Sequence, residues 1–124
     1  MMFTNLMVNN FGPYKDRHEF DLRPETDDVN SRPIILFGGL NGSGKTKLLE
    51  AIQLALYGPS ILGPRTAVAK YHRLLRRWTY RSELTGETSE SATIVLDFDH
   101  NFIGRTEHYT VIRSWKLLKT KVSE

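Results

Sequence analysis

The segment that most constrains the fold of this 124-residue chain is Gly39-Leu40-Asn41-Gly42-Ser43-Gly44-Lys45-Thr46. It matches the pattern G-x-x-x-x-G-K-[ST] at every position. The glycines let a short loop bend tightly, so that successive backbone N–H groups point into one concave nest that suits phosphate oxygens. An apolar run at residues 34–37 precedes the loop and a helical pattern at residues 45–57 follows it. The motif therefore stands in the strand–loop–helix context that it requires.

This context predicts a site for a nucleoside triphosphate with magnesium. The loop opens onto a helix N-terminus, whose partial positive charge attracts phosphate. We expect Lys45 to reach the β- and γ-phosphates and the Thr46 hydroxyl to bind the Mg²⁺ that bridges them. ATP and Mg²⁺ are therefore the predicted cofactors. The residues predicted to hold them are Gly39, Asn41, Gly42, Ser43, Gly44, Lys45 and Thr46.

Hydrophobic periodicity predicts an α/β fold with a mixed sheet. Alternating apolar and polar residues indicate two antiparallel hairpins, and the continuous apolar run before the glycine-rich loop is typical of a buried central strand. Two helices are expected, and Gly58 and Pro59 should end the first of them. The predicted strands are residues 3–9, 17–22, 34–37, 92–99 and 109–115, and the predicted helices are residues 45–57 and 66–78.

Composition narrows the class of protein. A hydrophobic content of 40% is enough for the core of one domain. The chain has no cysteine, which excludes disulfides and thiolate metal sites and fits a reducing cytoplasm. The apolar stretch around residues 48–57 is too short to span a bilayer, and the first ten residues lack the pattern of a secretory signal. We therefore expect a cytoplasmic protein that does not cross a membrane.

The charge of the chain is uneven, and this unevenness predicts an anionic partner. Residues 51–82 contain six cations and no acidic residue, although the whole chain carries a net charge of only +3. Contact with DNA, contact with a partner protein and a solvated helix face all remain open for this run. In the predicted helix, Val68, Tyr71, Leu75 and Trp78 would line one face. The candidate DNA contacts are Arg65, Lys70, Arg73, Arg76 and Arg77.

The loop and its surroundings resemble the N-terminal head segment of SMC-like ATPases. This branch of the ABC ATPases includes the cohesin and condensin subunits and the RecF and RecN repair proteins. The resemblance rests on Phe11-Gly12-Pro13-Tyr14, on residues 38–46 and on Leu49-Glu50-Ala51-Ile52. A closer similarity is to DndD, the SMC-like ATPase of bacterial DNA phosphorothioation (sulfur-modification) systems. It is carried by residues 32–42, 51–58 and 109–115.

The resemblance implies that residues 1–124 form lobe I of an ABC/SMC-like head. In such heads a second lobe supplies the signature motif, the Walker B aspartate and the catalytic glutamate. The chain has no LSGG-like segment, no heptad run and no Q-loop glutamine, so we expect it to bind nucleotide and hardly hydrolyse it alone. The implied partners are DNA, a second head that closes over ATP to form a homodimer, and other DNA-modification subunits.

The resemblance also assigns roles outside the loop. Lys15 and Arg17 correspond to positions that contact the base or ribose in related heads, although a solvated charged turn would look the same. Lys47 departs from the DndD pattern, which usually has a small hydroxyl residue at this position. We therefore expect an extra cation beside the loop that alters nucleotide affinity.

Three alternatives to a phosphorothioation ATPase remain open. The run Ile94-Val95-Leu96-Asp97 resembles a Walker B strand, which would make this a compact P-loop kinase or GTPase-like enzyme that uses Asp97. The short remainder of the chain and the alternating pattern instead suit a half-exposed antiparallel strand. The second alternative is a repair ATPase of the RecF or RecN type. The third is a scaffolding chain that binds DNA or a protein regardless of ATP.

Overall fold

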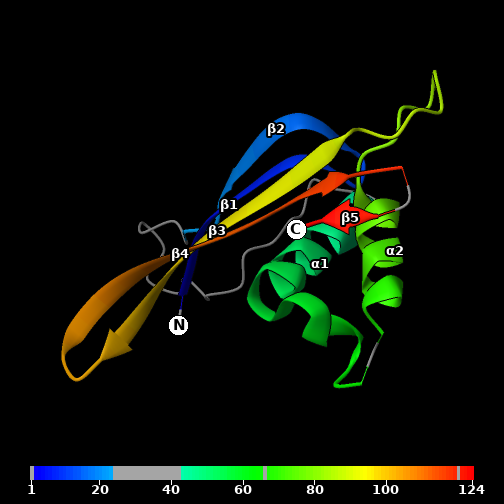
Figure 1. The fold of residues 1–124 in the computed structure, drawn as a ribbon. Coiled ribbons are helices and arrows are strands. Elements are labelled where there is room, and N and C mark those ends of the chain that lie inside the picture. Colours follow the sequence, from blue (N-terminus) through cyan, green and yellow to red (C-terminus); the bar gives the residue numbers. More distant parts are fainter. Residues whose placement is uncertain (1, 24–42, 66, 120) are drawn as a thin grey trace.

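A computed structural model describes residues 2–23, 43–65, 67–119 and 121–124 of the chain. Within these described ranges, five strands form one antiparallel sheet, and the helices lie together against one of its faces (Figure 1). The elements in chain order are β1 (Met2–Phe11), β2 (Tyr14–Asp21), α1 (Ser43–Tyr57), the 3₁₀ helix η1 (Gly58–Leu62), α2 (Val68–Trp78), β3 (Ser91–Phe102), β4 (Arg105–Leu117) and β5 (Val122–Ser123).

The strand order β2-β1-β3-β4-β5 places β1 beside both β2 and β3. Val8 lies opposite Ile94, and Leu6 lies opposite Leu96, so the apolar residues of β1 and β3 share one face of the sheet. All four side chains are fully buried. Successive side chains of a strand point to opposite faces, so the alternating residues between them form the other, more polar face.

The helices fill the buried face of the sheet. Leu48, Ala51 and Leu54 of α1 are completely buried in the same core as the apolar residues of the strands. Phe11 at the end of β1 makes edge-on ring contacts with Trp78 of α2, at 5.9 Å between centroids, and with Trp115 of β4, at 6.2 Å. One aromatic residue therefore joins β1, α2 and β4.

A buried chain of hydrogen bonds reinforces this junction. The Trp115 indole Nε1 donates to the Thr79 hydroxyl at 2.8 Å, and that hydroxyl donates to the backbone carbonyl of Leu75, also at 2.8 Å. Thr79 follows α2 directly, so the bonds hold the end of that helix against β4. The indole N–H would otherwise be a buried donor without an acceptor, which is costly.

The end of α1 is set by a glycine and an arginine. Gly58 adopts the left-handed conformation at φ +54°, and a Cβ at this position would lie 2.8 Å from the guanidinium of Arg113. Arg113 donates to the carbonyl of Ala55 in the last turn of α1 at 3.3 Å and pairs with Glu124 at 3.2 Å. Its positive charge suits the negative end of the helix dipole.

Most of the sequence-based element predictions are confirmed. Both predicted hairpins form, and α1 ends before Gly58 as expected. The second turn is tighter than the predicted 100–104, because β3 and β4 remain paired up to Phe102 and Arg105. Leu49, an apolar residue of the predicted helix 45–57, is 49% exposed. The strand predicted at 34–37, and with it the mixed character of the sheet, lies outside the described residues.

None of the helices described by the structure combines the length and apolar character needed to cross a membrane.

Candidate functional site

Helix α1 begins inside the phosphate-binding motif. Its first residue is Ser43, so Ser43, Gly44, Lys45 and Thr46 form its first turn, and the Thr46 side chain is exposed. The first turn contains no acidic residue, so none of its own side chains opposes the partial positive charge of its N–H groups. These features fit a triphosphate with Mg²⁺ at this helix end. Gly39, Asn41 and Gly42, also predicted to hold the phosphates, lie outside the described residues.

The ammonium of Lys47 has two partners among the described residues. Its ammonium lies 2.8 Å from a carboxylate oxygen of Glu50 and 4.7 Å from the centre of the Trp78 ring. Its methylenes pack against Gly12, where a Cβ would lie 3.1 Å from the Lys47 Cγ. Its side chain is only 24% exposed. Lys47 therefore joins α1 to the β1–β2 turn and to α2. These contacts favour a packing role over that of an extra cation beside the loop, and the expected effect on nucleotide affinity stays a prediction.

The two residues predicted to contact the base or ribose lie at the start of β2. Lys15 is exposed, and His18 Nε2 lies 2.8 Å from its backbone carbonyl oxygen. Arg17 is exposed and pairs with Glu19 at 3.1 Å. Arg17 lies opposite Asn9 in the sheet, whereas His18 lies opposite the buried Val8. His18 is thus on the helix side of the sheet and Arg17 on the other side. No sequence motif marked His18, and the nucleotide roles of Lys15 and Arg17 stay predictions.

Asp97 is poorly placed to serve as a Walker B aspartate. It lies in β3, which runs antiparallel to both of its neighbours. The adjacent Leu96 faces the buried helix side, so Asp97 faces the opposite side of the sheet. There its carboxylate accepts a hydrogen bond from the Thr110 hydroxyl at 2.6 Å. Among the described residues, no three His, Asp or Glu side chains gather closely enough to hold a metal ion. These contacts argue against a compact enzyme that uses Asp97.

Helix α2 is amphipathic, with a buried aromatic side and a cationic outer side. Tyr71, Leu74, Leu75 and Trp78 are buried, whereas Val68, predicted to lie on the same face, is 68% exposed. It begins the helix, where the core no longer covers it. Burial raises the pKa of Tyr71, and the hydrogen bond from its hydroxyl to Glu124, at 2.7 Å, adds to this effect.

The candidate DNA contacts do not form one uniform surface. Arg65, Lys70, Arg73 and Arg77 are exposed. Arg76 is exposed too, but its guanidinium donates to the backbone carbonyls of Leu118 and Lys121 at 2.8 and 3.3 Å. Arg76 therefore holds the β4–β5 connection against α2, a role that the charge run did not predict.

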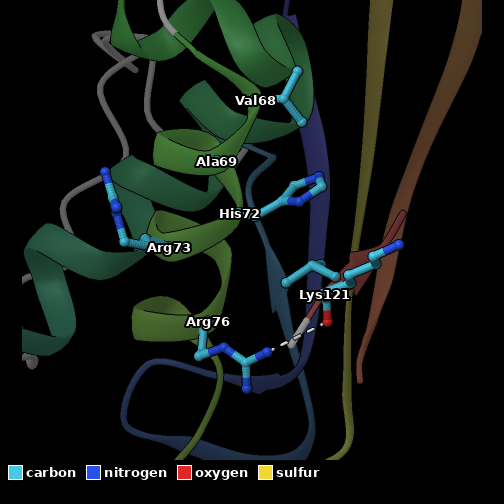
Figure 2. A pocket seen from close by; sticks show the side chains of 7 residues that line it. Val68, Ala69, His72, Arg73, Arg76 and Lys121 are labelled. Atoms are coloured by element: carbon cyan, nitrogen blue, oxygen red, sulfur yellow. Dashed lines mark hydrogen bonds between the residues drawn. The ribbon is translucent and has the colours of Figure 1, made fainter. Parts of the chain in front are cut away.

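A groove of about 490 Å³ separates α2 from the segment around β5, and we name it the α2–β5 groove. Figure 2 shows His72 and Arg76 directed from α2 toward Lys121, while the Arg73 side chain points to the other side of the helix. The lining combines apolar residues with cations and includes no acidic residue. The lining residues are Val68, Ala69, His72, Arg73, Arg76, Lys121 and Val122.

Comparison of the sequence with known protein families shows which family this chain belongs to. The sequence pattern described as an AAA domain matches residues 5–124, which is nearly the whole chain. The chain belongs to the AAA domain family. The matched region includes the phosphate-binding motif and the start of α1.

Two curated relatives share part of this AAA domain, and each is named as the C subunit of the nuclease SbcCD. The protein from Vibrio cholerae serotype O1 (strain ATCC 39315 / El Tor Inaba N16961) is 38% identical over 61 residues, covering 49% of this chain and 6% of that protein. The protein from Staphylococcus haemolyticus (strain JCSC1435) is 40% identical over 55 residues, covering 44% of this chain and 5% of that protein. The matches therefore span only about a twentieth of the length of these relatives.

A solved structure supports the fold of the AAA domain over its full length. It comes from work on the structural biochemistry of ATP-driven dimerization and DNA-stimulated activation of SMC ATPases. The superposition has a TM-score of 0.59 at 15% sequence identity and covers 100% of this chain and 73% of that chain. The predicted SMC-like head fold is confirmed. The comparisons confirm the predicted family only as far as the AAA domain, and the assignments to the SMC-like ATPases and to DndD stay predictions.

Proposed function

We propose that this AAA domain is the ATP-binding N-terminal lobe of an SMC-like ATPase that acts on DNA. The observation that carries the proposal is the start of α1 at Ser43, inside the P-loop motif, within a fold that matches an SMC ATPase structure. Lys45 neutralises the β- and γ-phosphates in this proposal, and Thr46 holds Mg²⁺. Bound Mg·ATP supplies the concentrated negative charge around which the loop and a second head close.

The packing of α1 supports a fixed phosphate site. Leu48, Ala51 and Leu54 anchor one side of the helix in the core, so its N-terminus is held by buried contacts. Lys47 is neutralised by Glu50 and covers Trp78, so Lys45 is the motif lysine that remains for the phosphates. A preorganised helix end of this kind binds an anion without a large ordering cost.

The proposed site is incomplete within these 124 residues. Asp97 faces the wrong side of the sheet for the bound metal, and the sequence has no signature motif. We propose that a second lobe and a second head complete the site, so the isolated chain binds nucleotide but hardly hydrolyses it. A homodimer closed by ATP is consistent with the ATP-driven dimerization described for the SMC ATPase of similar fold.

The outer side of α2 is the proposed DNA contact. Lys70, Arg73 and Arg77 are exposed. Cations on one helix side suit the phosphate backbone and read no base sequence. Arg65 lies just before the helix and extends the same charge. Arg76 is assigned mainly to holding the β4–β5 connection, because its guanidinium already binds two carbonyls.

Within DNA metabolism, we propose DNA phosphorothioation, together with the other subunits of such a system. Support comes from the DndD-like stretches at residues 32–42, 51–58 and 109–115. A second candidate is DNA repair or end processing, which is favoured by the 38% and 40% identity to the two nuclease subunits. A cell in which this gene is deleted would lose sulfur from its DNA in the first case and keep it in the second.

The test of nucleotide binding is calorimetric titration of the chain with Mg·ATP. Binding should be lost in Lys45→Ala and kept in Asp97→Asn, since Asp97 lies on the far side of the sheet. Phosphate release should be barely detectable in both variants and in the parent chain. Binding that survives Lys45→Ala would refute the P-loop proposal. Turnover that disappears in Asp97→Asn would instead establish a compact enzyme.

A further inference from the structure

An acidic loop with an exposed apolar tip follows α2 and projects from that end of the molecule (Figure 1). We name residues 82–90 the acidic loop, because they contain Glu83, Glu87 and Glu90 and no cation. Leu84 near its tip is 97% exposed, the highest value among the exposed large hydrophobic residues that the structure describes. The loop therefore presents one exposed apolar side chain among carboxylates.

The acidic loop is ordered by its own hydrogen bonds. The Gly86 N–H donates to the Ser82 carbonyl at 2.8 Å, and the Ser82 N–H donates to the Glu87 carbonyl at 2.9 Å. Arg81, just outside the loop, donates to the Gly86 carbonyl at 2.7 Å. Gly86 has φ +70°, which a glycine adopts without strain. Leu84 is thus presented on a preformed turn, which lowers the entropy cost of docking it.

The α2–β5 groove is complementary to this loop in charge and in polarity. His72, Arg76 and Lys121 converge on it, and no acidic residue lines it. Val68 supplies exposed apolar surface at 68%, whereas Val122 lines the groove but is only 7% exposed. Arg76 is held in place by two backbone carbonyls, so part of the cationic lining is already fixed.

We infer that the acidic loop of one copy docks in the α2–β5 groove of a second copy of this chain. Leu84 packs against Val68 at the groove, and the carboxylates of Glu83 and Glu87 pair with Lys121 and its cationic neighbours. Within one copy the two surfaces do not meet, because Leu84 is almost fully exposed. Each copy carries one loop and one groove, so a reciprocal two-fold contact closes the assembly as a dimer.

A second copy suits this groove better than DNA does. A phosphate backbone needs cations but gains nothing from the exposed Val68, whereas a leucine flanked by carboxylates uses the cations and the apolar side chain. Of the proposed DNA contacts on α2, Arg73 also lines the groove, but Lys70 and Arg77 do not, so DNA contact through Lys70 and Arg77 remains compatible with the dimer. The contact uses no residue of the P-loop and therefore does not depend on the proposed nucleotide binding.

The test is sedimentation velocity of the full chain without nucleotide, over a wide range of protein concentration. We expect a concentration-dependent dimer that weakens by about tenfold or more in 1 M NaCl, where charges are screened within about 3 Å. Leu84→Asp should abolish the dimer. The matched control is Ile103→Asp, because Ile103 is also exposed at a turn, at 86%, but lies at the tip of the β3–β4 hairpin.

Charge reversal gives a sharper test of the pairing. Lys121→Glu and Glu87→Lys should each weaken self-association by about tenfold or more, because each places like charges in contact. Mixing the two variants should restore a heterodimer, since the groove of the Glu87→Lys chain is intact and the loop of the Lys121→Glu chain is intact. Arg105→Glu, in the exposed hairpin, is the control for an equal change of charge.

Three outcomes would overturn the inference. One is a chain that stays monomeric at every concentration, and another is a dimer that Leu84→Asp leaves unchanged. The third is a monomer that binds a short duplex DNA and loses this binding in Lys121→Glu, which would make the groove a nucleic-acid site. Circular dichroism of each variant checks that the exposed substitutions leave the fold intact.

Discussion

Replacement of Lys47 by methionine separates a structural role of this lysine from a role at the phosphates. The side chain is 24% exposed, and that of its partner Glu50 is 27% exposed, so the ion pair at 2.8 Å is largely shielded. Methionine keeps the methylenes that pack against Gly12 and removes only the charge. We therefore expect a loss of stability without a change in nucleotide affinity.

The magnitude follows from the contacts that the ammonium makes. An ion pair three residues apart on a helix contributes about 0.3–0.5 kcal/mol, and a cation over an indole at 4.7 Å contributes about 0.5–1 kcal/mol. The variant also leaves the Glu50 carboxylate half-buried without its cation, so the total should be about 1–2 kcal/mol. In a domain of this size, such a loss lowers Tm by about 3–8 °C.

The assay is thermal unfolding followed by circular dichroism, combined with calorimetric titration of Mg·ATP. The affinity for Mg·ATP should stay within about twofold of the parent chain. Glu50→Gln is the matched partner variant, and a double-mutant cycle should assign about 0.5 kcal/mol to the ion pair itself. A tenfold weaker affinity for Mg·ATP in Lys47→Met would refute the reasoning, because it would mean that the ammonium reaches the phosphates.

Further predictions concern stability. Thr79→Val should lower the free energy of unfolding by about 1–3 kcal/mol in denaturant titrations, because it leaves the buried indole N–H of Trp115 without an acceptor. Thr79→Ser keeps the hydroxyl and should retain most of the parent stability. Ile103→Asn should stabilise the chain by about 0.5–1.5 kcal/mol, since Ile103 and Gly104 have φ +47° and +70° in a two-residue hairpin loop, where asparagine is favoured. Tyr71 should make stability fall as pH rises above its ordinary pKa of 10.0, because the unfolded chain then loses a proton that the folded chain keeps; Tyr71→Phe should reduce this alkaline loss in urea titrations.

The elements with a strong local pattern were predictable from sequence. Helix α1 carries both a P-loop at its start and Gly58-Pro59 at its end, and its observed bounds differ from the prediction by two residues at the start only. The strands β3 and β4 alternate clearly, so their pairing was expected. The placement of β1 between β2 and β3 was not, because strand order depends on contacts between segments far apart in the chain.

In the candidate site too, the features marked by a local motif were predictable and the contacts between distant residues were not. Ser43 to Thr46 were assigned by a local motif, and the structure begins α1 at the first of them. The contacts of Lys47 with Trp78 and of Arg76 with two distant carbonyls were missed, because nothing local marks a cation as a packing residue. Val68 was assigned to the core by periodicity alone, which cannot tell where the sheet stops covering a helix.

Helix α1 is fastened at both of its ends. Lys47 ties its first turns to the β1–β2 turn and to α2, and Arg113 ties its last turn to β4 and to Glu124. A helix held at both ends cannot slide or tilt independently of the domain around it. A displacement of its N-terminus, where the phosphates are proposed to bind, therefore also moves the far edge of the sheet.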